Sequence, residues 1–330
     1  MEYSLAFILF VIGLAFIFDF TNGFHDAGNS IATIVATRVL TPVQAVIWAA
    51  FFNFIAFLFF KLSVASTIGT GLVDTEIVSP SLIFAALVSA IIWNIITWYV
   101  GLPSSSSHAL IGGIVGAAIG QGGVSALKME GLIKVLSAIV LSPLMGILIG
   151  ILISALMIKL TKNWGEEIKN RCFKFVQLLS SAMLSLSHGG NDAQKTMGII
   201  SLLLYSASLQ EERFAVPLWV VISCNMVMAL GTLFGGWRIV HTMAQKITPL
   251  DPVRAACAET GAAIVIFAAT NFGVPVSTTH TVTGAIAGVG VSNSFWSTNW
   301  QIMNRIFLTW ALTIPATSLI AIAVIALFHL

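Results

Sequence analysis

Two aspartates, Asp26 and Asp192, lie within apolar stretches of the sequence, and each is flanked by glycine and asparagine. An ionisable side chain in an apolar medium is costly unless it faces a cavity or a partner, so such residues are candidates for function. A carboxylate beside exposed carbonyl oxygens makes an oxygen-rich cation site. We therefore predict a cation site, with sodium as a candidate at both aspartates, formed by Asn22, Asp26, Asn29, Asn191 and Asp192.

The segments around the two aspartates, residues 22–30 and 188–196, are polar and rich in glycine. Glycine permits close backbone approach, and Asn or Asp can satisfy freed backbone groups. We therefore expect a break in an otherwise helical segment at each place. In an apolar medium, irregular backbone is tolerated only where it lines a cavity or is buried in protein.

Hydroxyl side chains gather at two further places, after Pro103 and after Pro275. Proline suits the first turn of a helix, and hydroxyls that follow it can lie among unpaired N–H groups at the positive end of the helix dipole. Such an N-terminus binds anions, and a tetrahedral oxyanion can accept hydrogen bonds at all its oxygens. The predicted donors are Ser104, Ser105, Ser106, Ser107, Ser277, Thr278 and Thr279.

Several other polar side chains in apolar stretches are candidates for carrying protons. Histidine titrates near neutral pH, and the two histidines that follow the hydroxyl runs could also be ligands or hydrogen-bonded packing residues. The candidates are His25, His108, His280, Lys195 and Glu259.

The composition indicates that these residues are positioned by membrane-spanning helices. Of 330 residues, 58% are hydrophobic and 8% charged, whereas a soluble domain has roughly 25% charged residues. A helix needs about 20 apolar residues to cross a bilayer, and residues 80–100, 136–158, 216–237 and 306–328 meet this length. We predict an all-α polytopic membrane protein. The net charge of +2, with no basic stripe, gives no indication of a nucleic-acid partner.

The polar motifs recur in the same order along the chain. GFHDA at residues 23–27 matches GGNDA at 189–193, and GLPSSSSH at 101–108 matches GVPVSTTH at 273–280. The offset is 166 residues between Asp26 and Asp192 and 172 between His108 and His280. Two motifs at nearly the same offset indicate a duplication. We predict a first membrane repeat at residues 1–160, a cytoplasmic linker at 161–170 and a second repeat at 171–330.

The charges favour repeats of inverted topology, with broken helices and Ser/Thr-rich half-helix tips near the midplane of the membrane. Residues 66–80 contain acids but no Lys or Arg, whereas the corresponding residues 238–254 contain three basic residues. Five crossings per repeat place most basic residues in the cytoplasm and both termini outside. The basic residues expected outside are Lys61, Lys128, Lys134 and Arg213, and the second and third of these oppose the charge rule.

Four segments carry a resemblance to a known family: GFHDAGNSIAT at residues 23–33, GLPSSSSHALIG at 101–112, SHGGNDAQKTMG at 187–198 and GVPVSTTHTVTG at 273–284. They resemble the duplicated signatures of the inorganic phosphate transporter (Pit) family, and the resemblance covers nearly the whole chain. It implies an inorganic phosphate symporter of inverted-repeat fold, a homodimer, with a proton or sodium as coupling ion and no cofactor. We include Gln194 in the expected phosphate site.

The residues at two positions resemble those of bacterial low-affinity members of that family. These are His25, where Asn is common in the family, and Lys195 after Gln194. Neither His nor Lys is a natural sodium ligand, so we favour a proton over sodium as the coupling ion. Some bacterial members carry neutral metal–phosphate complexes. The expected location is the inner membrane of a bacterium.

Other functions fit less of the pattern. Symport of another oxyanion such as sulfate would use the same N–H and hydroxyl donors, and a passive anion channel would need no ion gradient. An intramembrane enzyme is not expected, because the chain has neither a Gly-x-Ser-x-Gly elbow nor an HExxH metal pair.

Overall fold

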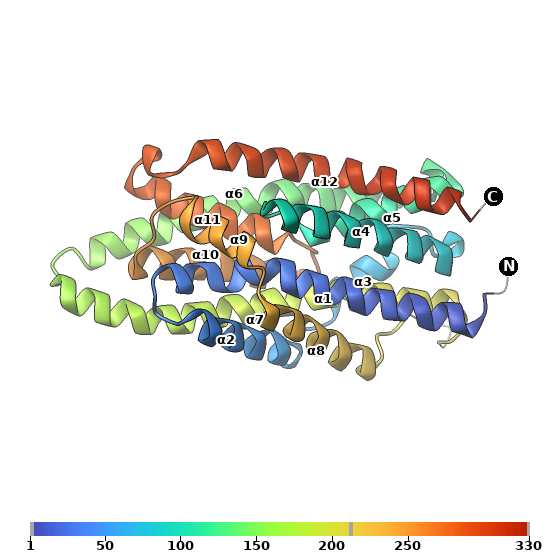
Figure 1. The fold of residues 1–330 in the computed structure, drawn as a ribbon, viewed down its shortest axis with the longest axis horizontal. Coiled ribbons are helices and arrows are strands. Elements are labelled where there is room, and N and C mark those ends of the chain that lie inside the picture. Colours follow the sequence, from blue (N-terminus) through green and yellow to red (C-terminus); the bar gives the residue numbers. More distant parts are fainter. Residues whose placement is uncertain (1–2, 211–213, 329–330) are drawn as a thin grey trace.

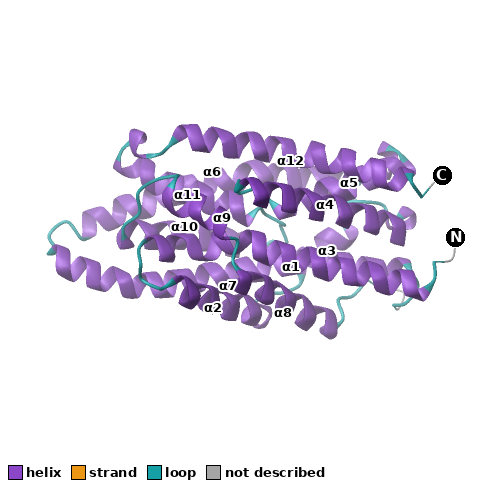
Figure 2. Ribbon diagram, in the orientation of Figure 1, coloured by secondary structure: helices purple, strands orange, loops and turns teal. Residues whose placement is uncertain are grey.

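The computed structural model describes residues 3–210 and 214–328, which form a bundle of helices (Figures 1 and 2). Apart from an isolated β-bridge between Val73 and Leu127, no β-structure occurs in these two ranges. The α-helices are α1 (Leu5–Ala36), α2 (Pro42–Ile55), α3 (Ser63–Thr70), α4 (Pro80–Val100), α5 (Ser106–Gly122), α6 (Met129–Leu160), α7 (Glu166–Ser206), α8 (Leu218–Phe234), α9 (Trp237–Gln245), α10 (Pro252–Asn271), α11 (Thr278–Asn293) and α12 (Trp300–Ala326).

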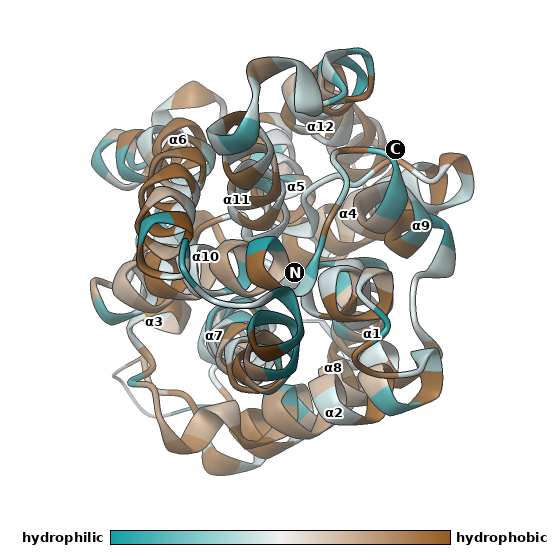
Figure 3. Cartoon of the chain, turned by 90° about the vertical axis from the view of Figure 1, so that its left-hand side faces the viewer, coloured by the Kyte–Doolittle hydropathy of each residue, from teal (hydrophilic) through white to brown (hydrophobic). Residues whose placement is uncertain are grey.

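The prediction of a polytopic helical membrane protein is confirmed. Within the described residues, α1, α4, α6, α10 and α12 are long and apolar enough to cross a bilayer, and up to seven spans result if each bent helix pair forms one. The outer face of α6 carries exposed leucines at every fourth position: Leu144, Leu148, Leu152 and Leu156. Seen along the long axis, such peripheral helices are strongly hydrophobic (Figure 3). This surface suits lipid contact.

The helices that carry the repeated aspartates, α1 and α7, run in opposite directions, and the helices of the two halves exchange partners. In Figure 1, α1 runs away from the end that holds both termini, whereas α7 runs toward it. Helix α5 packs against α12 and α11 packs against α6, and similarly α1 contacts α8 while α2 contacts α7. The halves are therefore interlocked rather than side by side.

Small residues allow these interlocked helices to approach closely. A Cβ atom on Gly112 of α5 would lie 2.8 Å from the carbonyl oxygen of Ile314 in α12, and one on Gly288 of α11 would lie 2.9 Å from the Cα of Ile147 in α6. Backbones packed this closely are typical of glycine-lined interfaces between membrane helices. They fix α5 and α11, whose N-termini carry the hydroxyl runs.

The predicted breaks at residues 22–30 and 188–196 are wrong, because α1 and α7 continue through both segments. The glycines there serve close packing instead. A Cβ on Gly189 would lie 2.6 Å from the carbonyl oxygen of Asn53 in α2, and one on Gly23 would collide with the backbone of Met228 in α8. Glycine can thus admit a neighbouring helix without interrupting its own helix.

The breaks lie elsewhere in the bundle. Helices α2 and α3 are bent by 81° at their junction, and α8 and α9 by 70°. Non-helical residues also separate α4 from α5 and α10 from α11, so α5 and α11 begin as the predicted Ser/Thr-rich tips. The predicted linker at 161–170 is a short turn followed by the first residues of α7. Arg213, expected outside, lies beyond the described residues.

Candidate functional site

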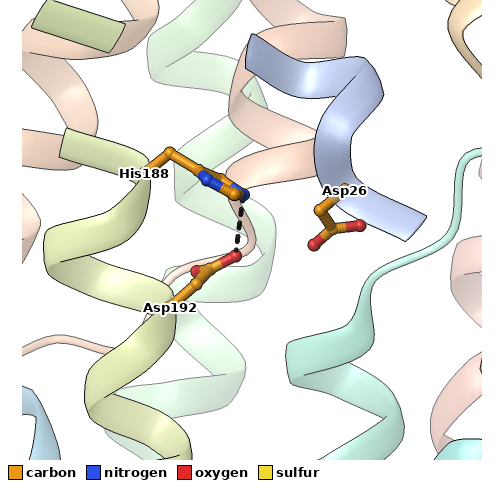
Figure 4. Close-up of side chains that lie close together, drawn as sticks. All are labelled: Asp26, His188 and Asp192. Atoms are coloured by element: carbon orange, nitrogen blue, oxygen red, sulfur yellow. Dashed lines mark ion pairs between the residues drawn. The ribbon is translucent and has the colours of Figure 1, made fainter. Parts of the chain in front are cut away.

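The two repeated aspartates come together between α1 and α7. Asp26 is 2% exposed and Asp192 is fully buried. Figure 4 shows the Asp26 carboxylate, from α1, facing His188 and Asp192, from α7. One ligand atom from each of these three residues lies within 4.8 Å of the other two. Buried carboxylates at this spacing repel one another unless positive charge or hydrogen bonds compensate them.

Three side chains next to Asp192 supply positive charge or a hydrogen bond to its carboxylate. The Lys195 ammonium donates to its Oδ1, and His188 Nε2 lies 3.3 Å from its Oδ2. The Thr278 hydroxyl, at the start of α11, donates to Oδ2 at 2.9 Å. His188 is in turn held by Asn53, whose Oδ1 lies 3.2 Å from His188 Nδ1. The carboxylate is thereby fixed against the tip of α11.

Asp26 has a different environment. His25 Nδ1 lies 2.8 Å from its Oδ1, and the Thr279 hydroxyl donates to the same oxygen at 3.3 Å. His25 Nε2 lies 3.1 Å from the Thr97 hydroxyl, which lies 3.0 Å from the Ser104 hydroxyl. A continuous hydrogen-bonded chain therefore runs from Asp26 through His25 and Thr97 to the residues that precede α5.

The N-termini of α5 and α11 meet at this place. Ser105 and Ser277 cap the two helices by accepting hydrogen bonds at 3.2 Å from the backbone N–H groups of His108 and His280. The two histidine rings are 4.3 Å apart, centroid to centroid. The prolines precede these caps instead of standing in the first helical turn as expected. Because both positive helix ends point here, the site suits an anion.

Several buried polar atoms of the site have no hydrogen-bond partner among the described residues. They include the Ser106 hydroxyl, a potential anion donor, and the side-chain oxygens of Asn22, Asn29 and Asn191. The Asn29 amide nitrogen, by contrast, donates to Thr279 at 2.9 Å, and that of Asn191 donates to Thr270 at 2.8 Å. The free amide oxygens are the kind of ligand that a small hard cation takes.

Gln194 and Glu259 lie in other polar contacts. The Gln194 side-chain oxygen accepts from the backbone N–H groups of Val64 and Ala65 and so caps α3. Glu259 of α10 accepts hydrogen bonds from Gln177 and Ser180, both on α7. The direct hydrogen bonds of both residues therefore go to these partners and to neighbouring backbone, not to the two aspartates or the tip hydroxyls.

The ring nitrogens of His108 and His280 have no hydrogen-bond partner in the described part of the chain. The His280 ring instead stacks on Trp310 at 3.6 Å between centroids. Among the residues that the structure describes, the rings are thus packed against aromatic neighbours without the side-chain hydrogen bonds that the packing alternative assumed.

Sequence reasoning missed three residues of the site: His188, Asn53 and Thr97. His188 could have been found, because it precedes Asp192 by four positions and therefore shares its helix face. Thr97 and Asn53 carry no such signal, since Thr97 lies 72 residues from His25 and Asn53 lies 135 residues from His188. Asp19, on α1, accepts a hydrogen bond at 2.8 Å from Thr196 of α7 and adds a further buried acid nearby.

Residues 22–321 match the model of the phosphate transporter family. A probable low-affinity inorganic phosphate transporter of Rhizobium meliloti (strain 1021) is 55% identical, over 97% of this chain and 97% of that one. A protein of the same description from Bacillus subtilis (strain 168) is 41% identical, over 96% of each chain. A solved structure described as the sodium-dependent phosphate transporter superposes with a TM-score of 0.88 at 25% identity, covering 98% of this chain and 99% of that one.

Proposed function

The chain belongs to the phosphate transporter family, and we propose that it carries inorganic phosphate across a membrane in symport with a cation. The family and the relatives above are transporters and not enzymes, so the buried Ser, His and Asp residues serve binding. The proposed location is the inner membrane of a bacterium, in keeping with the bacterial relatives. A homodimer, which the family resemblance implies, is part of the same proposal.

One observation carries this proposal: two hydroxyl-bearing helix N-termini converge on two buried carboxylates. Phosphate would accept hydrogen bonds from the free Ser106 hydroxyl and from Ser107, Thr278 and Thr279, which line the same tips. Ser104 adds a hydroxyl before α5. Ser105 and Ser277 would act chiefly through their caps, which hold the N–H groups in place. Gln194 would not contact phosphate and would act indirectly, by capping α3.

The position of the carboxylates favours phosphate over sulfate. Thr278 and Thr279 lie 2.9 and 3.3 Å from carboxylate oxygens of Asp192 and Asp26. An anion bound by these hydroxyls therefore lies against an acceptor. Hydrogenphosphate retains an O–H group that can donate to a carboxylate, whereas sulfate has none and would leave two negative groups in contact, which is costly in a buried site.

The same carboxylates would hold the coupling cation, together with the free amide oxygens of Asn22, Asn29 and Asn191. We favour a proton over sodium, because the side chains paired with the carboxylates are His25, His188 and Lys195, which present nitrogen. Hard cations take oxygen ligands. Imidazole with carboxylates suits a divalent transition metal, so Asp26, His188 and Asp192 would also accommodate phosphate carried as a metal complex.

Reconstitution of the purified protein into proteoliposomes tests this function. Uptake of labelled phosphate is measured with a pH gradient and a sodium gradient imposed separately, and unlabelled sulfate is added as a competitor. A symporter accumulates phosphate against its gradient only when one ion gradient is present. Gradient-independent equilibration would identify a channel, and equal competition by sulfate would refute the argument from the carboxylates.

A further inference from the structure

The two halves present matching stripes of polar side chains that differ in one chemical respect. Residues at positions i, i+4 and i+7 share one face of a helix, and the offset of 166 residues relates the stripe on α1 to that on α7. The α1 stripe is amide, carboxylate, amide, and the α7 stripe is imidazole, carboxylate, ammonium. The pairs are Asn22 with His188, Asp26 with Asp192, and Asn29 with Lys195.

The ammonium of Lys195 is enclosed by oxygen atoms. Lys195 is 1% exposed. Its Nζ donates to the Asp192 carboxylate, to the Ser107 hydroxyl and, at 2.8 Å, to the carbonyl oxygen of Val276. These oxygens come from α7, the tip of α5 and the segment before α11. A carboxylate, a hydroxyl and a carbonyl oxygen are the ligand types that a hard metal cation takes. Here the Lys195 ammonium, a cation covalently attached to the chain, contacts all three.

The stripe on α1 has no such occupant. The side-chain oxygens of Asn22 and Asn29 have no hydrogen-bond partner among the described residues. Within the described ranges, Asp26 forms no ion pair with Lys or Arg, and the ring that contacts its carboxylate is the imidazole of the neighbouring His25. Unpartnered oxygen ligands for an exchangeable cation therefore lie on the helix face that carries Asp26, whereas both carboxylate oxygens of Asp192 already have partners in Lys195, His188 and Thr278.

We propose that Lys195 is a resident cation that fills the cation site of the second half, so that an exchangeable cation binds only at the stripe of the first half. The inference rests on the proposed cation-coupled transport of phosphate, and it narrows the cation site proposed there from both carboxylates to Asp26 and its neighbours. It gives Lys195 a role distinct from the proton carrier suggested by sequence. It also implies that the protein binds one exchangeable cation fewer than the repetition of the aspartates would suggest.

Replacing Lys195 with the residue found at its repeat mate tests this role. Lys195→Asn leaves Asp192, Ser107 and Val276 with free oxygens and adds an amide oxygen, so the vacated site should accept sodium. Phosphate binding to the purified protein is measured by calorimetry at fixed pH, with sodium replacing choline. In the variant, saturating sodium should strengthen phosphate binding by roughly 5–150-fold, the usual range for coupled ligands. The phosphate affinity of the unmodified protein should not show this additional increase with sodium.

Two further variants control for the loss of a lysine and for misfolding. Lys134 also donates to a backbone carbonyl, that of Gly273 at 3.5 Å, but lies outside the site, so Lys134→Asn should retain the sodium response of the unmodified protein. Asp192→Asn combined with Lys195→Asn removes both buried charges together, which avoids an uncompensated carboxylate. The phosphate affinity of this double variant should be lower than that of the unmodified protein and should show no new increase with sodium, since the variant lacks the carboxylate that would hold the ion.

Three results would overturn the proposal. The first is phosphate binding by Lys195→Asn with an unchanged sodium response. The second is loss of binding at every sodium concentration with recovery in Lys195→Arg, which would make the side chain a direct phosphate ligand. The third is a new sodium response in the double variant. Absence of phosphate uptake by the unmodified protein would instead refute the proposed function, and that measurement involves no variant.

Discussion

The hydroxyl of Thr279 offers the sharpest test of the anion site. It is the second residue of α11, accepts a hydrogen bond from the Asn29 amide at 2.9 Å, and donates to Asp26 Oδ1 at 3.3 Å. If phosphate binds at the tip, this hydroxyl turns its proton from Asp26 to a phosphate oxygen. Thr279→Val keeps the shape of the side chain and removes this donor.

The expected loss follows from the charge of the acceptor. A hydrogen bond to a charged group contributes about 1.5–3 kcal/mol, and about 1.4 kcal/mol corresponds to a tenfold change in affinity. The free hydroxyl already donates to Asp26, but over a long 3.3 Å, so Thr279→Val should weaken phosphate binding by roughly 10- to 150-fold, toward the lower end of that range. The free protein should also lose about 1–3 kcal/mol of stability, because the buried Asn29 amide loses its better acceptor. Calorimetric titration of phosphate into the purified variant measures the first quantity, and thermal unfolding measures the second.

Two variants separate the hydroxyl from general damage to α11. Thr279→Ser keeps the donor and should retain most of the affinity. Thr281 lies on the same helix, is fully buried, and donates only to its own helix at the Ser277 carbonyl oxygen, 2.9 Å away. Thr281→Val should therefore leave phosphate affinity nearly unchanged. If Thr279→Val is folded and binds phosphate within about twofold of the unmodified protein, a change far below one charged hydrogen bond, the tip of α11 is not the anion site.

Three other predictions follow from the same geometry. Asp26→Asn together with Asp192→Asn should reduce gradient-driven phosphate uptake far more than protein level, since a dianion in a buried site needs compensating positive charge; unimpaired accumulation would place coupling elsewhere, with Glu259 as the next candidate. Single cysteines at exposed Glu76 and Lys246, on a background without native cysteines, should react with an impermeant label from opposite sides of intact cells, and labelling from the same side would exclude the inverted topology. Gly288→Val should separate α11 from α6 and lower the melting temperature, because its Cβ would lie 2.9 Å from the Cα of Ile147; a melting temperature at or above that of the unmodified protein would show that the backbones relax apart without cost.

Repetition within the sequence was the signal that predicted most of the site. Asp26 and Asp192 recur with their neighbours, and the structure brings them together between α1 and α7. The two hydroxyl runs recur as well, and both begin helices whose first N–H groups need partners. A residue that recurs at equivalent places in two interlocked halves lies near its counterpart when the axis that relates the halves passes close by. The matching offsets indicate the duplication but not the position of that axis.

The glycines misled the sequence reading, and the reason is physical. Glycine weakens an isolated helix, so polar segments rich in glycine were taken as breaks. In the bundle, Gly23 and Gly189 lie where neighbouring backbones cross, and a side chain there would collide with Met228 or Asn53. Packing against the neighbour outweighs the lower helix propensity of one residue. Whether a glycine breaks a helix or admits a second one depends on what faces it, and a single sequence does not contain that information.

The segments that hold the two tips also depend on contacts between the halves. Gly101 and Gly273 end α4 and α10 with φ values of 74° and 64°, a left-handed conformation that favours glycine. The carbonyl oxygen of Gly101 accepts a hydrogen bond at 2.8 Å from Thr242 of α9, and that of Gly273 accepts one at 2.7 Å from Thr67 of α3. Each half thus supplies the short helix that holds the turn before the other half's tip. Because the partners are exchanged in this way, comparison of the halves predicted where the turns lie but not what secures them, and a movement of α3 or α9 would act directly on the tip of the opposite half.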